Sequence, residues 1–286
     1  MFTDNPVTPI RLETLLGVLQ DCGQRSLPED VVISLLQPGG LPGLRESSSG
    51  AKDTIKAAIE LQLVRRDGDV LTLTERISRK QAIRDSVLEA CDELVLGTAD
   101  VENYLALFYS YMLGLGSEGV GRTRKDWVDG FNQTAFGGRT ENPFNETKLG
   151  GINRWFSYLG LGWLEPNANG DFQCNPYHRL RRRLPDVFGR KRKLEDDEFM
   201  LRVAEVFPEL DGGALFRKAN PRYDAVAKQV TQGLADALLE LHLDGILVLH
   251  GERDSDGWSL NVAAPPVDGT LRSERFDFVE RKREES

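Results

Sequence analysis

One pattern occurs three times along this chain of 286 residues: an amphipathic helix, a short strand, a polar turn and a returning strand. The copies begin near Ile55, Ile152 and Leu234, so they start roughly 80 to 100 residues apart, and such regular self-similarity is not expected from composition alone. The pattern therefore predicts three related modules, and a chain of this length has room for them.

The first copy shows how the spacing predicts each element. Ile55, Ile59 and Leu63 recur every four residues and so share one face of a helix. The period then falls to two in Leu71-Thr-Leu73, as in a half-buried strand, and Asp67-Gly68-Asp69 supplies a turn because Asp-Gly tolerates positive φ. The matching strands and turns of the other copies are Phe172-Gln-Cys174 after Asn169-Gly170 and Trp258-Ser-Leu260 after Asp256-Gly257.

A helix that runs into a β-hairpin is the closing half of a winged helix-turn-helix. The expected fold class is therefore mainly α with small β-hairpins (α+β), arranged as tandem winged helix-turn-helix units. The predicted boundaries are 1–76 for the first unit, 77–98 for a connecting helix, 99–177 for the second unit, 178–194 for a basic linker, 195–264 for the third unit and 265–286 for a charged flexible tail.

Composition indicates a cytoplasmic protein that does not enter a membrane. No apolar run approaches the roughly 20 residues needed to span a bilayer, and no secretory signal is visible at the start. The three cysteines, Cys22, Cys91 and Cys174, are far apart and form no CxxC pair, which argues against a disulfide framework and against a structural zinc ion.

The charge is negative overall but unevenly distributed. The net charge is −9, and an acidic protein repels phosphate over most of its surface. The segment from His178 to Lys193 nevertheless carries eight arginines and lysines against one acid, Asp186. This segment can be interpreted as an arm that contacts phosphates, or as a solvated linker whose cations pair with the neighbouring acids Glu195 to Glu198.

The candidate nucleic-acid-binding residues come from the second unit and from the basic segment. The third helix of the second unit offers a mix of cationic and amide groups, which suits phosphates and base edges. The third helices of the first and third units are diluted by acids, such as Glu60 and Asp236, so we expect them to contact proteins instead. The candidates are Lys148, Asn153, Arg154, Arg179, Arg181, Arg182, Arg183, Arg190, Lys191, Arg192 and Lys193.

The sequence offers little that predicts catalysis. Gly114–Gly119 matches GxGxxG, but it follows an aromatic helix rather than a strand, so it is not a dinucleotide fingerprint. The histidines His178, His242 and His250 are scattered, and the adjacent acids Glu195 to Glu198 cannot all face one point. We therefore expect no catalytic residue, no cofactor and no metal site, and we expect the protein not to be an enzyme.

Three segments resemble the DpdG family of proteins. They are the opening Asn5-Pro-Val-Thr-Pro-Ile-Arg-Leu-Glu-Thr-Leu-Leu, the loop Leu36-Gln-Pro-Gly-Gly-Leu and the wing Leu-Val-Arg-Arg-Asp-Gly-Asp-Val-Leu-Thr-Leu73. The resemblance is one of layout over most of the chain. DpdG proteins are encoded with bacterial machinery that inserts 7-deazaguanine derivatives into DNA and restricts unmodified DNA. The resemblance implies an accessory, non-catalytic component of a phage-defence system, and it brings no family catalytic residues to this sequence.

Two main hypotheses of function follow. The first is a non-catalytic DNA-binding accessory subunit of a bacterial DNA-modification and phage-defence system, with DNA and other subunits, such as a helicase or ATPase, as partners. The second is an acidic tandem winged-helix adaptor that joins proteins within an SMC-like or helicase-containing complex. The basic segment favours the first hypothesis and the net acidity favours the second. A nuclease is a third hypothesis, which Mg²⁺-dependent cleavage would test.

Overall fold

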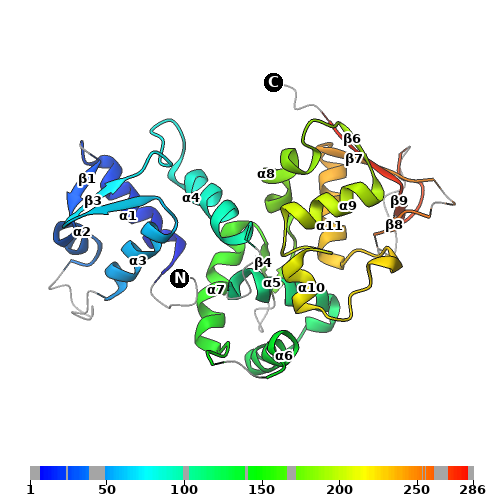
Figure 1. Cartoon of the computed structure of the whole chain (residues 1–286), viewed down its shortest axis with the longest axis horizontal. Helices are drawn as coiled ribbons and strands as arrows, with labels where there is room; N and C mark the ends of the chain where they lie inside the picture. Colours follow the sequence, from blue (N-terminus) through cyan, green and yellow to red (C-terminus); the bar gives the residue numbers. More distant parts are fainter. Residues whose placement is uncertain are drawn as a thin grey trace. The chain divides into compact units, whose positions relative to one another are not determined.

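A computed structural model shows a mainly helical protein with small antiparallel sheets, which confirms the expected fold class at this level (Figure 1). The chain divides into two compact units: unit 1 comprises Met1–Val95 and Asn145–Tyr158, and unit 2 comprises Leu96–Phe144 and Leu159–Ser286. The structure describes residues 7–23, 25–38, 49–98, 103–138, 141–165, 172–252, 254, 256–260 and 270–282.

Unit 1 begins with a helical segment that packs around a three-stranded sheet. The sheet has the order β1-β3-β2, and both pairings are antiparallel. In the register, Leu27 lies opposite Leu71 and Val64 opposite Leu73. The elements are α1 (Pro9–Asp21), β1 (Ser26–Pro28), α2 (Glu29–Leu36), α3 (Ser49–Glu60), β2 (Val64–Asp67) and β3 (Val70–Leu73).

Local sequence explains where these elements start and turn. The Thr8 side chain caps α1 by accepting from the N–H of Arg11, and Pro9 occupies a first-turn position that needs no donor. The apolar stripe of α1 is buried, and each such leucine contributes about 2 kcal/mol of transfer free energy. Gly68 has φ +59° at the tip of the β2–β3 hairpin, a conformation that the predicted Asp-Gly turn supplies without strain.

Two further helices complete unit 1. They are α4 (Ile83–Cys91), which a π-helical turn η1 (Asp92–Leu96) continues, and α7 (Glu146–Leu159). On α7, the buried indole N–H of Trp155 donates to the Val7 carbonyl at 3.2 Å, and the Tyr158 hydroxyl donates to Glu13 at 2.7 Å. These contacts tie α7 to the N-terminal helix. The segment predicted as one unit over 99–177 is therefore divided between the two units.

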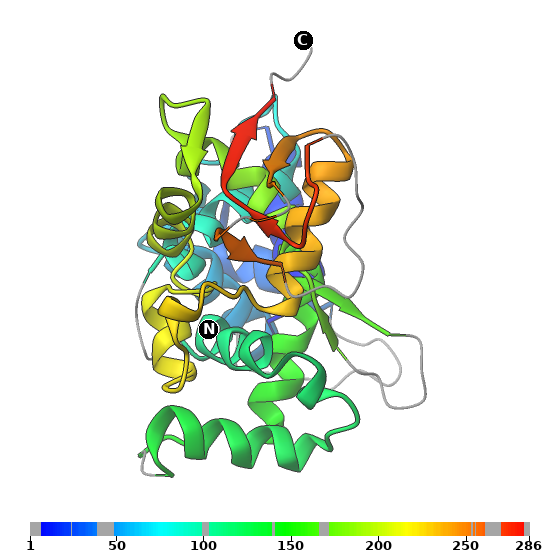
Figure 2. The ribbon, with the colours of Figure 1, turned by 90° about the vertical axis from the view of Figure 1, so that its right-hand side faces the viewer.

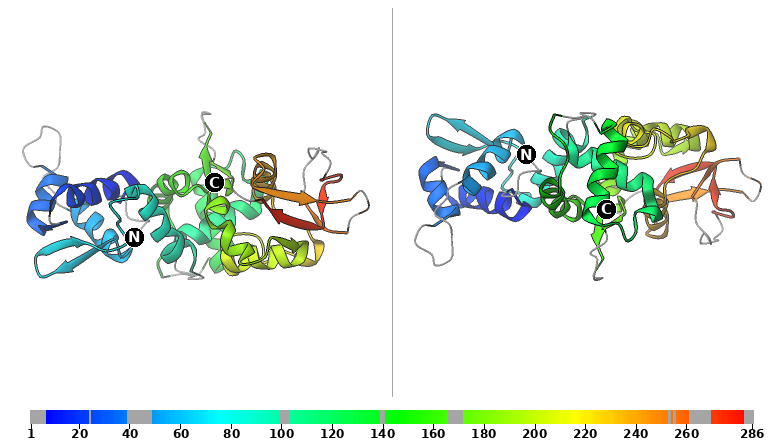
Figure 3. Two further views of the ribbon diagram at one scale, coloured as in Figure 1. Left: turned by 90° about the horizontal axis from the view of Figure 1, so that it is seen from above. Right: turned by 90° about the horizontal axis from the view of Figure 1, so that it is seen from below.

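Unit 2 holds the remaining elements and three small sheets, with orders β6-β10-β7, β4-β5 and β8-β9 (Figure 2). Its elements are α5 (Tyr104–Leu115), η2 (Gly116–Gly119), α6 (Arg124–Phe136), β4 (Gly162–Leu164), β5 (Phe172–Cys174), α8 (Tyr177–Phe188), β6 (Lys193–Glu195), α9 (Asp196–Val206), α10 (Ala214–Ala219), η3 (Ala225–Ala227), α11 (Gln232–Leu243), β7 (Leu247–His250), β8 (Trp258–Ser259), β9 (Arg275–Phe276) and β10 (Phe278–Arg281). The helix α9 packs on β6 and β10, as Figure 3 shows.

An aromatic cluster fixes α5 and α6 within unit 2. Phe108 stacks on Phe144 with centroids 4.7 Å apart, and Phe131 meets both rings edge-on at 5.1 and 5.0 Å. The Asn132 side chain donates to the Phe144 carbonyl at 2.8 Å and accepts from the Phe144 N–H at 3.0 Å. The expectation that Tyr104 to Leu113 forms a core helix is confirmed, because Leu105–Leu113 is buried throughout.

The segment interpreted as a basic linker, 178–194, is structured instead. Most of it forms the helix α8, because Leu180, Leu184 and Phe188 recur every four residues and are buried. The end of the segment enters β6, in which Leu194 is also buried. The density of charges in this segment suggested a linker, but the apolar stripe between them forms a helix.

The tail expected to be flexible, 265–286, also contributes to the fold. Phe276 and Val279 are fully buried in β9 and β10, and β10 is the central strand of the sheet β6-β10-β7. The third predicted hairpin is therefore wrong. The strand β7 pairs with β10, and β8, which was predicted to return along β7, pairs with β9. The predicted turn Asn169-Gly170 of the second hairpin lies outside the described residues, but β4 and β5 do pair as predicted.

The two units share one order of elements. In unit 1, the order α1-β1-α2-α3-β2-β3 ends in a sheet whose strands lie first, third, second. In unit 2, α8, β6, α9, α11, β7 and β10 follow the same order, with α10 and the β8–β9 pair inserted, and their sheet has the same strand arrangement. Among the described residues, no helix is both long enough and apolar enough to cross a membrane.

Candidate nucleic-acid interface

The basic segment is presented by α8 and by the turn that follows it. The buried stripe of α8 leaves Arg181 exposed and leaves Arg182 and Arg183 partly exposed. Gly189, with φ +55°, ends the helix, and its N–H donates to the Pro185 carbonyl at 2.8 Å. The four residues 190–193 that follow are all exposed, so the turn carries a dense group of cations on the surface of unit 2.

Arg179 does not belong to this surface. Its side chain is fully buried, its Nε lies 3.1 Å from Oε1 of the equally buried Glu209, and its guanidinium packs over the Phe207 ring at 4.9 Å. A buried guanidinium does not reach a phosphate, so the prediction of Arg179 as a nucleic-acid-binding residue is not supported by the geometry. Its partner lies 30 residues further along the chain, so no local sequence pattern predicts the ion pair.

The other arginines of α8 make contacts within unit 2. Arg181 Nη1 donates to the Tyr177 hydroxyl at 3.3 Å, and Arg183 forms an ion pair with Asp186 on the same helix. Arg182 Nη2 donates to the Leu159 carbonyl at 2.7 Å, where it satisfies the last residue of α7. Arg182 therefore has a structural contact, whereas Arg181 remains exposed.

The turn residues meet carboxylates and an aromatic ring. Lys191 Nζ lies 2.7 Å from Glu198 Oε1, and this hydrogen bond is the main reason that the pKa of Glu198 is lowered. Arg192 Nε lies 3.3 Å from Glu280, and Lys193 Nζ lies 3.3 Å from the centroid of the Phe278 ring. The pairing of this segment with neighbouring acids, which was one of the two interpretations of its charge, is thus present at Glu198.

The fold adds cations that are distant in sequence. The N–H of Arg281, at the end of β10, donates to the Arg192 carbonyl at 2.9 Å, and the exposed Lys282 follows it. Neither residue could be predicted from local sequence, because the pairing of β6 with β10 that places them here joins distant segments of unit 2. We call the resulting surface the basic edge, and it consists of Arg190, Lys191, Arg192, Lys193, Arg281 and Lys282.

The other predicted residues lie on unit 1. Lys148, Asn153 and Arg154 all belong to α7, where Arg154 is exposed and the other two are partly exposed. The predicted set is therefore divided between two units, and the structure defines no common surface for it.

The third helices differ in accessibility. In α3, Lys52 and Lys56 are exposed, but Lys56 lies 3.8 Å from Glu60. In α11, most residues are buried, and the exposed positions include Gln232 and Glu240. Neither helix offers a cationic face of the kind that enters a DNA groove.

The histidines and the acid run have structural contacts. The ring of His242 accepts from the Leu249 N–H through Nδ1 at 3.2 Å. Lys228 Nζ bridges Asp196 at 3.2 Å and Asp197 at 2.9 Å, and Asp197 also accepts from the Trp258 indole at 2.8 Å. Within the described ranges, no group of three or more His, Cys, Asp or Glu side chains is placed to hold a metal ion.

Comparison with known families assigns the chain to one protein family. Residues 3–256 match the family described as DpdG-like, and the protein therefore belongs to this family. Membership indicates a role in a DNA-modification system of several components. Comparisons with curated proteins and with solved structures gave no match.

Proposed function

We propose that the protein is a non-catalytic DNA-binding accessory subunit of a DNA-modification system that serves phage defence in the bacterial cytoplasm. Its family membership supports the assignment to a DNA-modification system, and the basic edge on unit 2 supports the proposed contact with DNA. The basic edge is the observation that carries the proposal, because it gathers six cations from two chain segments on a protein of net charge −9.

The shared order of elements supports this proposal. We interpret α1-β1-α2-α3-β2-β3 in unit 1, and the equivalent elements of unit 2, as two winged helix-turn-helix units. Helix-turn-helix proteins commonly read DNA through one helix in the major groove, while a second element contacts the DNA backbone. In this chain the basic edge lies at the end of the sheet β6-β10-β7 and beside α8, rather than on the third helix.

The ion pairs of the basic edge do not prevent phosphate binding. Exposed pairs such as Lys191–Glu198 and Arg192–Glu280 contribute about 0 to 1 kcal/mol each, so a phosphate can compete for the cations. Glu198 also keeps a second partner, Arg202, at 2.8 Å when Lys191 turns away. Each phosphate that binds releases counterions, so the affinity is expected to fall steeply with salt.

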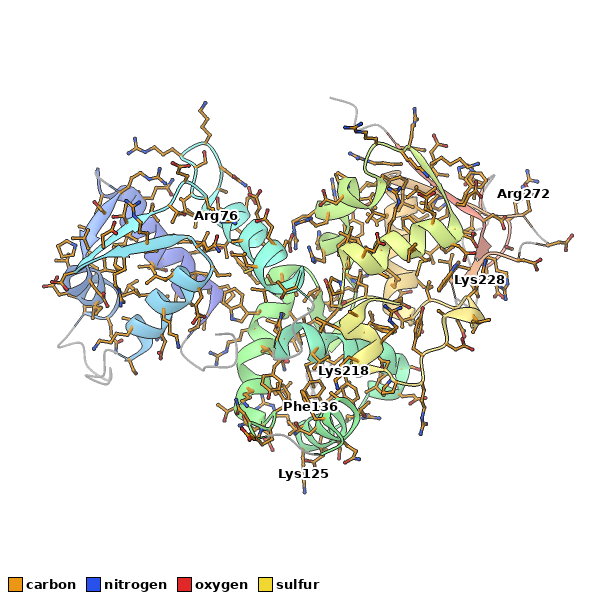
Figure 4. The ribbon with its side chains drawn as sticks, in the orientation of Figure 1. Arg76, Lys125, Phe136, Lys218, Lys228 and Arg272 are labelled. Carbon is orange, nitrogen blue, oxygen red and sulfur yellow. The ribbon has the colours of Figure 1, made fainter. Side chains whose placement is uncertain are left out.

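The test is duplex-DNA binding measured over a salt series. We expect the variant Arg190→Ala, Lys191→Ala, Lys282→Ala to lower the slope of log K against log salt by about 2 to 3, because about 0.9 is lost per phosphate contact. The matched control is Arg79→Ala, Lys80→Ala, Lys125→Ala, which removes three exposed cations elsewhere; Lys125 points away from α6 in Figure 4. Undetectable binding at low salt, or equal losses in both variants, would overturn the proposal.

An adaptor function is the second candidate, and one observation favours it. The β4–β5 hairpin exposes Trp163 and Leu164 to 49% and 47%, and large apolar side chains are costly to leave in water unless a partner covers them. An adaptor function predicts that Trp163→Ala weakens co-purification with a helicase or ATPase of the same system and leaves DNA binding unchanged. Incubation of DNA with Mg²⁺ tests the absence of catalysis, since cleavage would show a nuclease.

A further inference from the structure

A cavity of about 260 Å³ lies in unit 2, and the loop Gly114–Gly119 that matches GxGxxG forms part of its wall. Elements from distant parts of the sequence form its walls: η2, α6, β5 and α11. Figure 2 shows α11 beside the end of α5 from which η2 continues, as the contacts between these elements require. The lining includes Met112 of α5, Ser117 of η2, Trp127 of α6, Cys174 of β5, and Gln232 and Asp236 of α11.

Glycines hold two of these walls close together. A Cβ atom on Gly119 would lie 2.6 Å from the Trp127 ring, and one on Gly233 would lie 2.5 Å from the Cys174 carbonyl oxygen. Gly119 thus allows the loop to lie against the indole, and Gly233 allows α11 to approach β5. Trp127 is also held edge-on to Phe108, with centroids 6.0 Å apart. The cavity is therefore bounded by fixed groups.

The lining combines aromatic and aliphatic groups with one carboxylate. Asp236 is partly buried, and this burial raises the pKa of its carboxyl, while a hydrogen bond from Gln232 acts in the opposite direction. Among the residues that the structure describes, no lysine or arginine forms an ion pair with Asp236. A partly desolvated carboxylate beside apolar side chains is stabilised when a cation binds to it.

Trp127 already shows how such a wall receives a guanidinium. The Arg122 guanidinium carbon lies 5.6 Å from the indole, in a cation–π contact, and Arg122 also donates to the Glu118 carbonyl at 3.1 Å and the Tyr111 hydroxyl at 3.1 Å. Arg122 is thus engaged outside the lining of the cavity. A second planar cation would find aromatic rings, amide groups and a carboxylate within one small volume.

We propose that this cavity binds the guanidinium group of an arginine side chain presented by a partner protein. A guanidinium matches the carboxylate of Asp236 with paired N–H donors and stacks on aromatic groups, whereas a lysine ammonium does neither as well. The acids nearby in the sequence, Glu118 after Ser117 and Glu240 one helical turn after Asp236, favour a cationic partner and disfavour the phosphate of a nucleotide. The site is separate from the basic edge, so it does not rest on DNA binding.

The test uses three tripeptides with blocked ends, Gly-Arg-Gly, Gly-Lys-Gly and Gly-citrulline-Gly, titrated into the full chain. Binding is followed by NMR through the indole N–H signal of Trp127, assigned with Trp127→Phe. We expect the arginine peptide to shift this signal, with a Kd on the order of 1 mM, and to bind at least about fivefold more tightly than the lysine and citrulline peptides. Asp236→Asn should weaken arginine binding by about tenfold.

Glu240→Gln is the matched control, because it removes a carboxylate from the same helix without altering the lining. Equal loss in Asp236→Asn and Glu240→Gln would show diffuse electrostatic attraction and would overturn the site. Equal binding of the citrulline peptide, or tighter binding of guanosine monophosphate at the same signal, would also overturn it. Thermal unfolding of both variants checks that each is folded. The slope of DNA binding against salt should be unchanged in both variants, and this separates the inference from the proposed function.

Discussion

The two units build the same order of elements and use it differently. In unit 1 the third helix, α3, keeps Lys52, Lys56 and Glu60 exposed. In unit 2 the equivalent helix, α11, is enclosed by α8, α5 and η2, and its exposed residues, Gln232, Glu240 and Leu243, include no cation. Topology alone therefore does not locate a binding surface. The elements inserted around α11 convert a candidate recognition helix into a core helix, and the cations of unit 2 lie on α8 and the sheet end instead.

The cores differ as well. Unit 1 is held around α1 by an apolar stripe of leucines. Unit 1 also buries Asp92, but the core of unit 2 contains a fully buried ion pair, Arg179–Glu209, together with the buried Asp211. Removal of one member of such a pair leaves an uncompensated charge, so unit 2 is the more sensitive to single polar substitutions.

The largest expected effect is therefore at Arg179. Arg179→Met leaves Glu209 buried without its cation and should lower the free energy of unfolding by about 3 to 5 kcal/mol, measured by urea denaturation. The double variant Arg179→Met, Glu209→Gln should recover a large part of this loss, since no charge is then left buried. A loss below about 1 kcal/mol in the single variant would mean that the pair does not stabilise unit 2.

The next effect concerns pH. Burial raises the pKa of Asp211 to about 6, although the N–H and hydroxyl of Thr231 bind its carboxylate at 2.7 and 2.8 Å. Because the folded pKa lies above the unfolded value near 3.9, the folded state binds more protons between these values, and stability falls as the pH rises from about 4 to 6. The loss is on the order of 3 kcal/mol. Asp211→Asn should flatten this part of the pH profile of urea unfolding, and an unchanged profile would contradict the prediction.

A pair of glycine substitutions compares the two units directly. Gly233→Ala in α11 places a Cβ 2.5 Å from the Cys174 carbonyl oxygen and 2.7 Å from Leu113, so it should cost about 1 to 3 kcal/mol. Gly17→Ala in α1 meets only Ile83, at 3.8 Å, and should stabilise unit 1 by about 0.5 to 1 kcal/mol through helix propensity. Thermal unfolding checks both, and a Gly233→Ala variant as stable as the parent protein would show that α11 is not confined as described.

Local patterns predicted much of unit 1. The periodicity of Ile55 and Ile59 placed α3, although the helix ends at Glu60, before Leu63. The Asp67-Gly68 turn placed the β2–β3 hairpin, because this signal lies within a few residues of the contacts that it forms. The four-residue spacing of Leu180, Leu184 and Phe188 was also present in the sequence, but the charges around it obscured the helix.

The rest depends on contacts between distant segments. The pairing of β7 with β10 skips the nearer strand β8, and nothing near Leu247 indicates which later strand will be its partner. Of the basic edge, only Arg190 to Lys193 were predicted, because Arg281 joins Arg192 beside the pairing of β10 with the distant strand β6. The cavity was not predicted at all, since its lining runs from Met112 to Asp236 and only folding brings these residues together.

The smallest expected effect is on the face of α3. Lys52→Ala, Lys56→Ala removes two exposed cations, but Asp53 and Glu60 lie on the same helix and already weaken the attraction of this face for phosphate. DNA affinity at 0.1 M salt should change by less than about twofold, against a larger loss for the basic-edge variant. Fluorescence anisotropy with a labelled duplex measures both variants. A loss on α3 that equals the loss on the basic edge would mean that unit 1 binds DNA through its third helix, and the contrast drawn between the two units would then hold for their cores but not for their surfaces.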